Sequence, residues 1–166
     1  MIKSALLALA MVAIDQLSKW LVVKYVVFGS RHVVVPHCFN ITYITNSGAA
    51  WGVLSGHAWL LMTISFAVLA GILVFLSYLS EGWPERYCGL LLIASGIVGN
   101  AIDRVFRGGE VVDFLQLYAG RFYWPSFNVA DACITVGVTL YIASSVFRPE
   151  SGKGGSSNGL VFKPKP

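Results

Sequence analysis

The stretch SFNVADACITVGVTLYIASSVF, residues 126–147, decides the fold class. After Asp131 it has no charged residue before Arg148, and it is long enough to cross a bilayer, which needs roughly 17 to 25 mostly apolar residues. A charged group in such a span is costly, by about 2.5 to 3.5 kcal/mol on insertion scales. A second carboxylate, Asp113, lies upstream in the apolar run EVVDFLQLY. Both acids therefore need an explanation.

The composition is that of a small membrane protein. Of the 166 residues, 56% are hydrophobic and only 12% are charged, about half the charged fraction of a soluble domain. The net charge of +4 comes from scattered lysines and arginines, so we expect no nucleic-acid partner. The 3 cysteines form no close pair and have no metal-ligand spacing, which argues against a disulfide framework.

Three further segments have the length and apolarity of membrane spans. The sequence predicts helices at residues 4–28, 58–79, 88–106 and 127–147, which form one membrane domain over residues 1–148. The first resembles a secretory signal, but its apolar pattern continues well past the small-residue site, which favours a retained helix. Residues 149–166 are rich in Gly, Ser, Lys and Pro and are typical of a flexible extension, native or added.

The two long links between the helices predict a small β-rich platform. In FNITYITN the apolar residues alternate with polar ones, which is typical of half-buried strands. EVVDFLQLY, AG and RFYW predict a strand, a turn and a return. Both links fall on one side of the membrane, whereas SEGWPERY on the other side predicts a short polar turn. Basic residues are divided almost equally between the sides, and we favour cytoplasmic termini.

Polar groups also lie within the first and third helices. Asp15 and Lys19 are four residues apart, so they share a helix face as a self-neutralising pair that fixes packing or as a pair that contacts substrate. In GNAIDR, the spacing lets Asn100, Asp103 and Arg104 face one groove. The alternative is that Asp103 and Arg104 lie at the interface and extend toward water.

Each of the two acids near the last helix has a simple structural explanation when it is considered alone. Asn128 and Asp131 have the spacing of a capping box, so Asp131 can serve only to satisfy free N–H groups and to complement the helix dipole. Asp113 can face water at the interface.

Considered together, Asp113 and Asp131 predict a catalytic pair of carboxylates. The strand, turn and return bring Asp113 back over the start of the last helix, beside Asp131. Two carboxylates in contact hold a shared proton near neutral pH, as in an aspartic protease. The ionised acid takes a proton from water, and the protonated acid stabilises the developing oxyanion. The helix N-terminus favours the charge on Asp131, which leaves the proton on Asp113.

Other chemistries fit the sequence less well. It contains neither an H-E-x-x-H nor a G-x-S-x-G motif, and Cys133 fits a buried small residue. A small proton- or ion-coupled transporter that uses Asp15, Asp103 and Asp131 is the main alternative. Four helices without an internal repeat are, however, few for a transport path. A scaffold whose acids only cap helices is the third possibility.

Five short motifs in a fixed order resemble those of the lipoprotein signal peptidase family, also called signal peptidase II. They are DQLSK at 15–19, NSGAAWG at 46–52, GNAIDR at 99–104, EVVDF at 110–114 and FNVADA at 127–132. Ser47 stands where many members have Thr, and Trp51 stands where Phe is frequent. Both keep the chemical type and leave the acid pair unaffected.

The resemblance implies a four-helix aspartic endopeptidase of the bacterial inner membrane, with both termini cytoplasmic and the active site near the outer face. It implies prolipoprotein substrates, cut just before a diacylglyceryl cysteine, and inhibition by globomycin. It also implies contact with membrane lipid, no metal or cofactor, and a monomer. The implied catalytic residues are Asp113 and Asp131. The residues implied to bind substrate or support this pair are Asn46, Gly48, Asn100, Arg104, Asn128, Asp15, Lys19 and Asp103.

Overall fold

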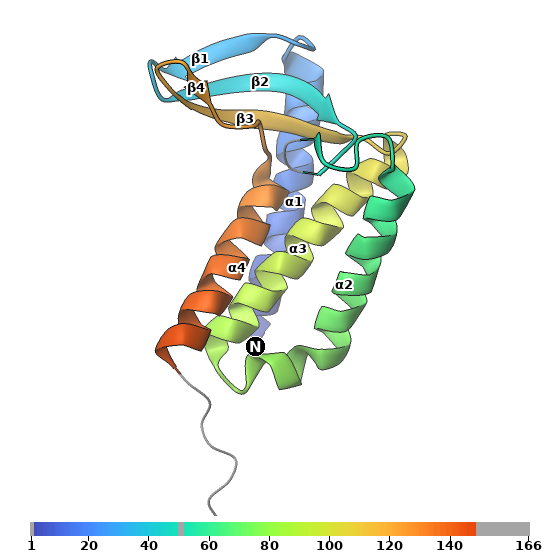
Figure 1. Cartoon of the computed structure of the whole chain (residues 1–166), viewed down its shortest axis with the longest axis vertical. Helices are drawn as coiled ribbons and strands as arrows, with labels where there is room; N and C mark the ends of the chain where they lie inside the picture. Colours follow the sequence, from blue (N-terminus) through green and yellow to red (C-terminus); the bar gives the residue numbers. More distant parts are fainter. Residues whose placement is uncertain (1, 50–51, 149–166) are drawn as a thin grey trace, which may run out of the picture.

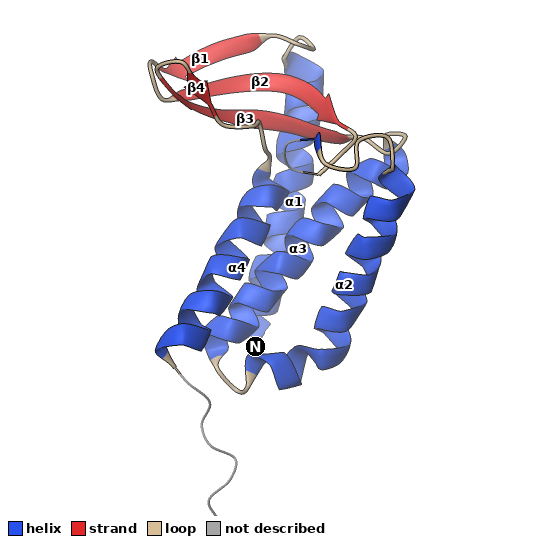
Figure 2. Cartoon of the chain, viewed as in Figure 1, coloured by secondary structure: helices blue, strands red, loops and turns tan. Residues whose placement is uncertain are grey.

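The computed structural model describes residues 2–49 and 52–148, which form a helical bundle with a small sheet across one end (Figure 1). The helices are α1 (Ile2–Tyr25), α2 (Ala58–Ser80), α3 (Pro84–Phe106) and α4 (Val129–Phe147). All 4 are long and apolar enough to cross a membrane. The sheet therefore lies at one end of a set of spans, as the sequence predicts (Figure 2).

Helix α3 is the centre of the bundle. Most of its span is buried, whereas only a small share of α2 is buried. It packs against each of the other helices, and its contact with α4 is the most extensive. The polar residues of α3 are thereby enclosed between α1 and α4, which is where a membrane protein can keep them.

Glycines let α3 and α4 approach closely. A Cβ atom added to Gly89 would lie 2.8 Å from the carbonyl oxygen of Gly137, and one added to Gly137 would lie 2.6 Å from that of Gly89. A Cβ atom on Gly96 would clash with the carbonyl oxygen of Ala130 and with Ile134. Small residues allow such backbone approach in membrane bundles. This seam fixes the start of α4 against the middle of α3.

The platform is a 4-stranded antiparallel sheet with the order β1-β2-β3-β4. Its strands are β1 (Arg31–Val35), β2 (Phe39–Asn46), β3 (Val111–Ala119) and β4 (Phe122–Tyr123). In the register of β2 with β3, Ile44 lies opposite Asp113, and Asn46 at the end of β2 lies opposite Val111. Beyond β4 the chain returns, and Phe127 pairs with Leu115. The start of α4 therefore lies next to Asp113.

The observed helix bounds differ from the predicted ones most at the start of α3 and next at the end of α1, which lies at Tyr25 and not at residue 28. Helix α3 begins at Pro84 and not at residue 88, because proline is well suited to the first helical turn. The predicted polar turn is therefore shorter, and Arg86 is buried, where it donates to Ser144 and to the carbonyl oxygen of Arg148 at the end of α4.

Two other starts moved by smaller amounts. Helix α1 covers Ile2–Tyr25 and not 4–28, and α4 begins after the extended Asn128, which caps it. Trp51 and the predicted flexible extension, residues 149–166, lie outside the described residues.

Candidate active site

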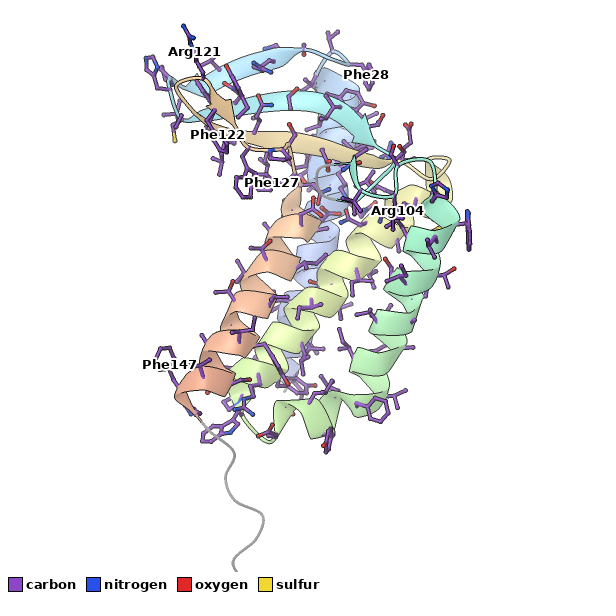
Figure 3. The ribbon with its side chains drawn as sticks, in the orientation of Figure 1. Phe28, Arg104, Arg121, Phe122, Phe127 and Phe147 are labelled. Carbon is purple, nitrogen blue, oxygen red and sulfur yellow. The ribbon has the colours of Figure 1, made fainter. Side chains whose placement is uncertain are left out.

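Asp113 and Asp131 lie in one cavity between the platform and the helices. Asp113 comes from β3 and is 2% exposed, while Asp131 lies in the first turn of α4 and is half-buried. The cavity has a volume of about 670 Å³. Its wall includes apolar side chains from β3, from the return segment and from α4, namely Leu117, Trp124, Phe127, Ile134 and Val136. In Figure 3, Phe127 and Arg104 lie at this junction, and Phe147 lies at the far end of α4.

Asn128 connects the two carboxylates. Its side-chain amide donates to Oδ1 of Asp113 at 2.8 Å, and its backbone N–H donates to Oδ2 of Asp131 at 3.2 Å. Its own Oδ1 accepts from the backbone N–H of Asp131 at 3.0 Å, which completes the predicted capping box. Asn128 has no exposed surface, so it holds both acids from behind the cavity.

Two more asparagines donate to the pair, one to each acid. Asn46, at the end of β2, donates to Oδ2 of Asp113 at 3.2 Å. Asn100, on α3, donates to Oδ1 of Asp131 at 2.7 Å. Each carboxylate therefore has hydrogen bonds to both of its oxygens. Such bonds fix the orientation of the acids and stabilise negative charge on them.

The electrostatic state of Asp113 is unusual for an aspartate. Burial and, after it, the negative charge of Asp131 raise the pKa of Asp113 to about 7, while hydrogen bonds from Asn128 and Asn46 oppose this shift. Asp113 therefore exchanges a proton near neutral pH.

Arg104 brings a cation to the cavity wall. Its Nη2 donates to the carbonyl oxygen of Gly48 at 3.0 Å, and the side chain lines the cavity. Gly48 in turn donates its N–H to Oδ1 of Asn46 at 2.9 Å. Nε of Arg104 is buried and has no hydrogen-bond partner among the described residues.

A second group of charges lies behind the cavity and is fully enclosed between α1 and α3. Lys19 contacts Asp15 at 2.9 Å and Asp103 at 3.2 Å, and we call these three residues the charge cluster. Asp15 also accepts from the backbone N–H of Ala130 in α4 at 2.8 Å. The cluster thus joins three helices, and its members are at most 1% exposed.

The prediction for the third helix was partly wrong. Asn100 and Arg104 do share the cavity wall, but Asp103 points toward α1 and accepts from the backbone N–H of Val112 at 3.0 Å. A helix turns by about 100° per residue. Seen down the helix axis, Asp103 therefore lies about 60° to one side of Asn100, and Arg104 lies about 40° to the other side. Asp103 also contacts Arg107 at 3.4 Å, a partner that the spacing in DRVFR could have indicated.

Asp15 and Lys19 form the predicted ion pair but do not contact the cavity, which favours a packing role over direct contact with substrate. Gln16 also connects α1 to α3, because its side-chain amide donates to the backbone carbonyl of Gly99 at 3.0 Å. Among the residues that the structure describes, no group of His, Cys, Asp and Glu side chains is arranged to hold a metal ion.

Comparison with known proteins shows the family of this chain. The family described as "Signal peptidase (SPase) II" matches residues 7–147. The chain belongs to the signal peptidase II family. It is 44% identical over 152 residues to the lipoprotein signal peptidase of Geobacillus thermodenitrificans, with 89% of this chain and 92% of that protein covered. It is 43% identical to that of Bacillus pumilus, with 81% of this chain and 86% of that protein covered.

Solved structures share the fold of this signal peptidase II. One is described as a bacterial membrane enzyme structure obtained by the in meso method at 2.3 Å resolution. It matches with a TM-score of 0.83 and 32% identity, and covers 93% of this chain and 94% of its own. A second, at 1.9 Å resolution, matches with a TM-score of 0.77 and 35% identity. This chain is therefore a multi-pass bacterial membrane peptidase, as the motifs predict.

Proposed function

We propose that this peptidase is an aspartic endopeptidase that removes signal peptides from prolipoproteins and cuts just before a diacylglyceryl-modified cysteine. One observation carries the aspartic mechanism: Asp113 and Asp131 face one cavity and are linked through the same residue, Asn128. The substrate class follows from the curated relatives, which are named lipoprotein signal peptidases.

The charges around the cavity support a dyad that holds one proton. Asp113, Asp131 and Arg104 lie in the cavity wall. Behind it, Lys19 contacts Asp15 and Asp103, and Arg107 contacts Asp103. Together these are four carboxylates and three cations. One bound proton makes this group neutral, which is favourable where water is scarce. With its pKa at about 7, Asp113 is the acid that gains and loses this proton near neutral pH.

The reaction then follows in two steps. Asp131 takes a proton from a water molecule as the water oxygen attacks the scissile carbonyl carbon, and Asp113 gives its proton to the carbonyl oxygen. The tetrahedral intermediate collapses when the C–N bond breaks. The proton held by Asp131 passes to the leaving nitrogen, and a hydroxyl proton of the intermediate returns to Asp113. The products are a carboxylic acid and an amine, and the dyad again holds one proton.

The cavity wall supplies the means to hold a lipid-anchored peptide. Apolar residues of α4, including Ile134 and Val136, face the cavity and can contact the substrate's apolar segment. The guanidinium group of Arg104 lies in the cavity wall and can donate to a backbone carbonyl of the substrate. The cyclic peptide globomycin would occupy the same cavity. In this proposal the enzyme acts as a monomer, and the platform lies outside the inner membrane with both termini in the cytoplasm.

The test compares two substrates of the same sequence, one with and one without the diacylglyceryl group on the cysteine. Purified protein in detergent is incubated with each, and both products are identified by mass spectrometry. We expect cleavage directly before the modified cysteine and none of the unmodified chain. Equal cleavage of both substrates, or a cut elsewhere, would contradict the proposed specificity. A proton flux into liposomes would instead support a transporter.

A further inference from the structure

We propose that Lys19 is a positioning residue for the dyad: its ammonium group fixes the side-chain amide of Asn100 in the one orientation that donates to Asp131. This inference rests on the proposed function, in which Asp131 activates the water molecule. It assigns to a helix α1 residue a part in the chemistry at the start of α4.

The contacts of Lys19 are complete without any substrate. Nζ lies 2.9 Å from Oδ2 of Asp15, 3.2 Å from Oδ2 of Asp103 and 3.0 Å from Oδ1 of Asn100. An ammonium group has three donors and no acceptor, so these three acceptors use its whole capacity. The side chain is 0% exposed and cannot touch a molecule in the cavity. Lys19 can therefore act on the reaction only through a neighbour or through its charge, which lowers the pKa of Asp113.

Asn100 is that neighbour. Its Oδ1 faces Lys19, and its Nδ2 donates to Oδ1 of Asp131 at 2.7 Å. If the amide turned over, its NH₂ group would face an ammonium group that only donates, and its oxygen would face a carboxylate oxygen that accepts. Both contacts would become repulsive. The cation on one side and the acid on the other therefore permit a single orientation.

The other two asparagines of the site are fixed differently. Oδ1 of Asn46 accepts from the backbone N–H of Gly48, and Oδ1 of Asn128 accepts from the backbone N–H of Asp131. Of these three amides, Asn100 is the one whose oxygen is fixed by a side chain. Its orientation can therefore be released by one substitution, which gives the inference a direct test.

A structural role of the charge cluster makes a different prediction. Lys19 also joins α1 to α3 through Asp103, so its loss will lower thermal stability whether or not it positions Asn100. The two roles separate in the turnover number. A loss of kcat that acts through Asn100 disappears when Asn100 is already absent, whereas a loss of kcat that comes from a structural role stays the same.

The experiment is a mutant cycle in detergent with a diacylglyceryl prolipoprotein as substrate. Its members are the wild type, Lys19→Met with Asp103→Asn, Asn100→Ala, and all three substitutions together. Removal of one positive and one negative side chain keeps the net charge of the cluster, and Asp103→Asn alone measures the share due to Asp103. Lys24→Met is the matched control, because Lys24 is an exposed lysine of the same helix. Melting temperature, kcat and KM are measured for each protein.

We expect the paired substitution to lower kcat by about 10- to 100-fold, the usual cost of losing a hydrogen bond to a charged group or its outer partner. In the Asn100→Ala background the same pair should lower kcat by less than about threefold, within the error of additivity. An equal loss in both backgrounds, or no loss in the first, would overturn the positioning role. If the pair does not fold, Lys19→Leu, which likewise cannot donate to Asn100, replaces Lys19→Met, and full kcat in that protein would overturn it as well.

The two proposals fail in different ways. If the wild type does not cleave the lipidated substrate, the proposed function is wrong. If it cleaves and the cycle is additive, the dyad stands and only the role of Lys19 is wrong.

Discussion

Asn128 offers a perturbation that separates helix capping from chemistry, because its side chain does both. Its oxygen caps α4 by accepting from the backbone N–H of Asp131, and its NH₂ group donates to Asp113. Serine retains a capping oxygen but is too short to donate to Asp113. Alanine retains neither. Asn128→Ser therefore keeps a cap on α4 and Asn128→Ala does not, while both variants lose the hydrogen bond to Asp113.

The magnitudes follow from these contacts. Loss of an N-cap costs about 1 kcal/mol, so Asn128→Ala should be less stable than Asn128→Ser by about that amount. A hydrogen bond to a carboxylate contributes about 1.5 to 3 kcal/mol, and about 1.4 kcal/mol corresponds to one pH unit. The bond from Asn128 lowers the pKa of Asp113 from what burial alone would give, so its loss raises that pKa above about 7. The alkaline limb of kcat should then move up by about 1 to 2 pH units in both variants.

The assay measures kcat from pH 5 to 10 with saturating lipidated substrate, and unfolding in detergent at one fixed pH, where the loss at Asp113 is the same in both variants and only the cap differs. Two results would refute the reasoning. Equal stability of the serine and alanine variants would mean that the side chain does not cap α4 in solution. An alkaline limb unchanged from the wild type would mean that Asn128 does not donate to Asp113 in the working enzyme.

Three further predictions test other parts of the site. The pKa of Asp113 is about 7 in the folded state and 3.8 ordinarily, so protonated Asp113 stabilises the folded state by up to about 4 kcal/mol below pH 4. This contribution is lost as the pH rises to about 7. A thermal-stability profile should show this loss, and Asp113→Asn should abolish it. Gly96→Ala should destabilise by about 1 to 3 kcal/mol and lower kcat, since its Cβ would push α4 away from α3. Gly71→Ala, where a Cβ meets nothing within 4 Å, is the matched control and should stabilise α2 slightly. Arg104→Gln should raise KM by about tenfold with a smaller change in kcat, through loss of the contact with Gly48 and of the cation in the cavity wall, and an unchanged KM would remove Arg104 from substrate binding.

Much of the fold could be predicted because local signals agreed with it. The apolar lengths predicted the four spans, and alternation predicted β2. The spacing of Asn128 and Asp131 predicted the capping box, which is a local device and so is visible in the sequence. The strand, turn and return between the last two helices predicted that Asp113 would come back to the start of α4.

The contacts that depend on distant packing were harder to predict. The direction of Asp103 depends on where α1 lies around α3, and no spacing within GNAIDR contains that information. Arg86 was assigned to a polar turn because it is charged, but it is buried against the end of α4, a partner distant in sequence. The link from Lys19 through Asn100 to Asp131 spans three helices, and no spacing in the sequence predicts it.

The central claim is that Asp113 and Asp131 together cut the peptide bond. The most direct test measures cleavage of a diacylglyceryl prolipoprotein at pH 7 by the wild type, Asp113→Asn and Asp131→Asn, with the fold of each checked by its melting temperature. The account predicts that both variants fold and that neither cuts. A folded variant that cuts at close to the wild-type rate would show that its acid only caps the helix or faces the cavity, and it would contradict the mechanism.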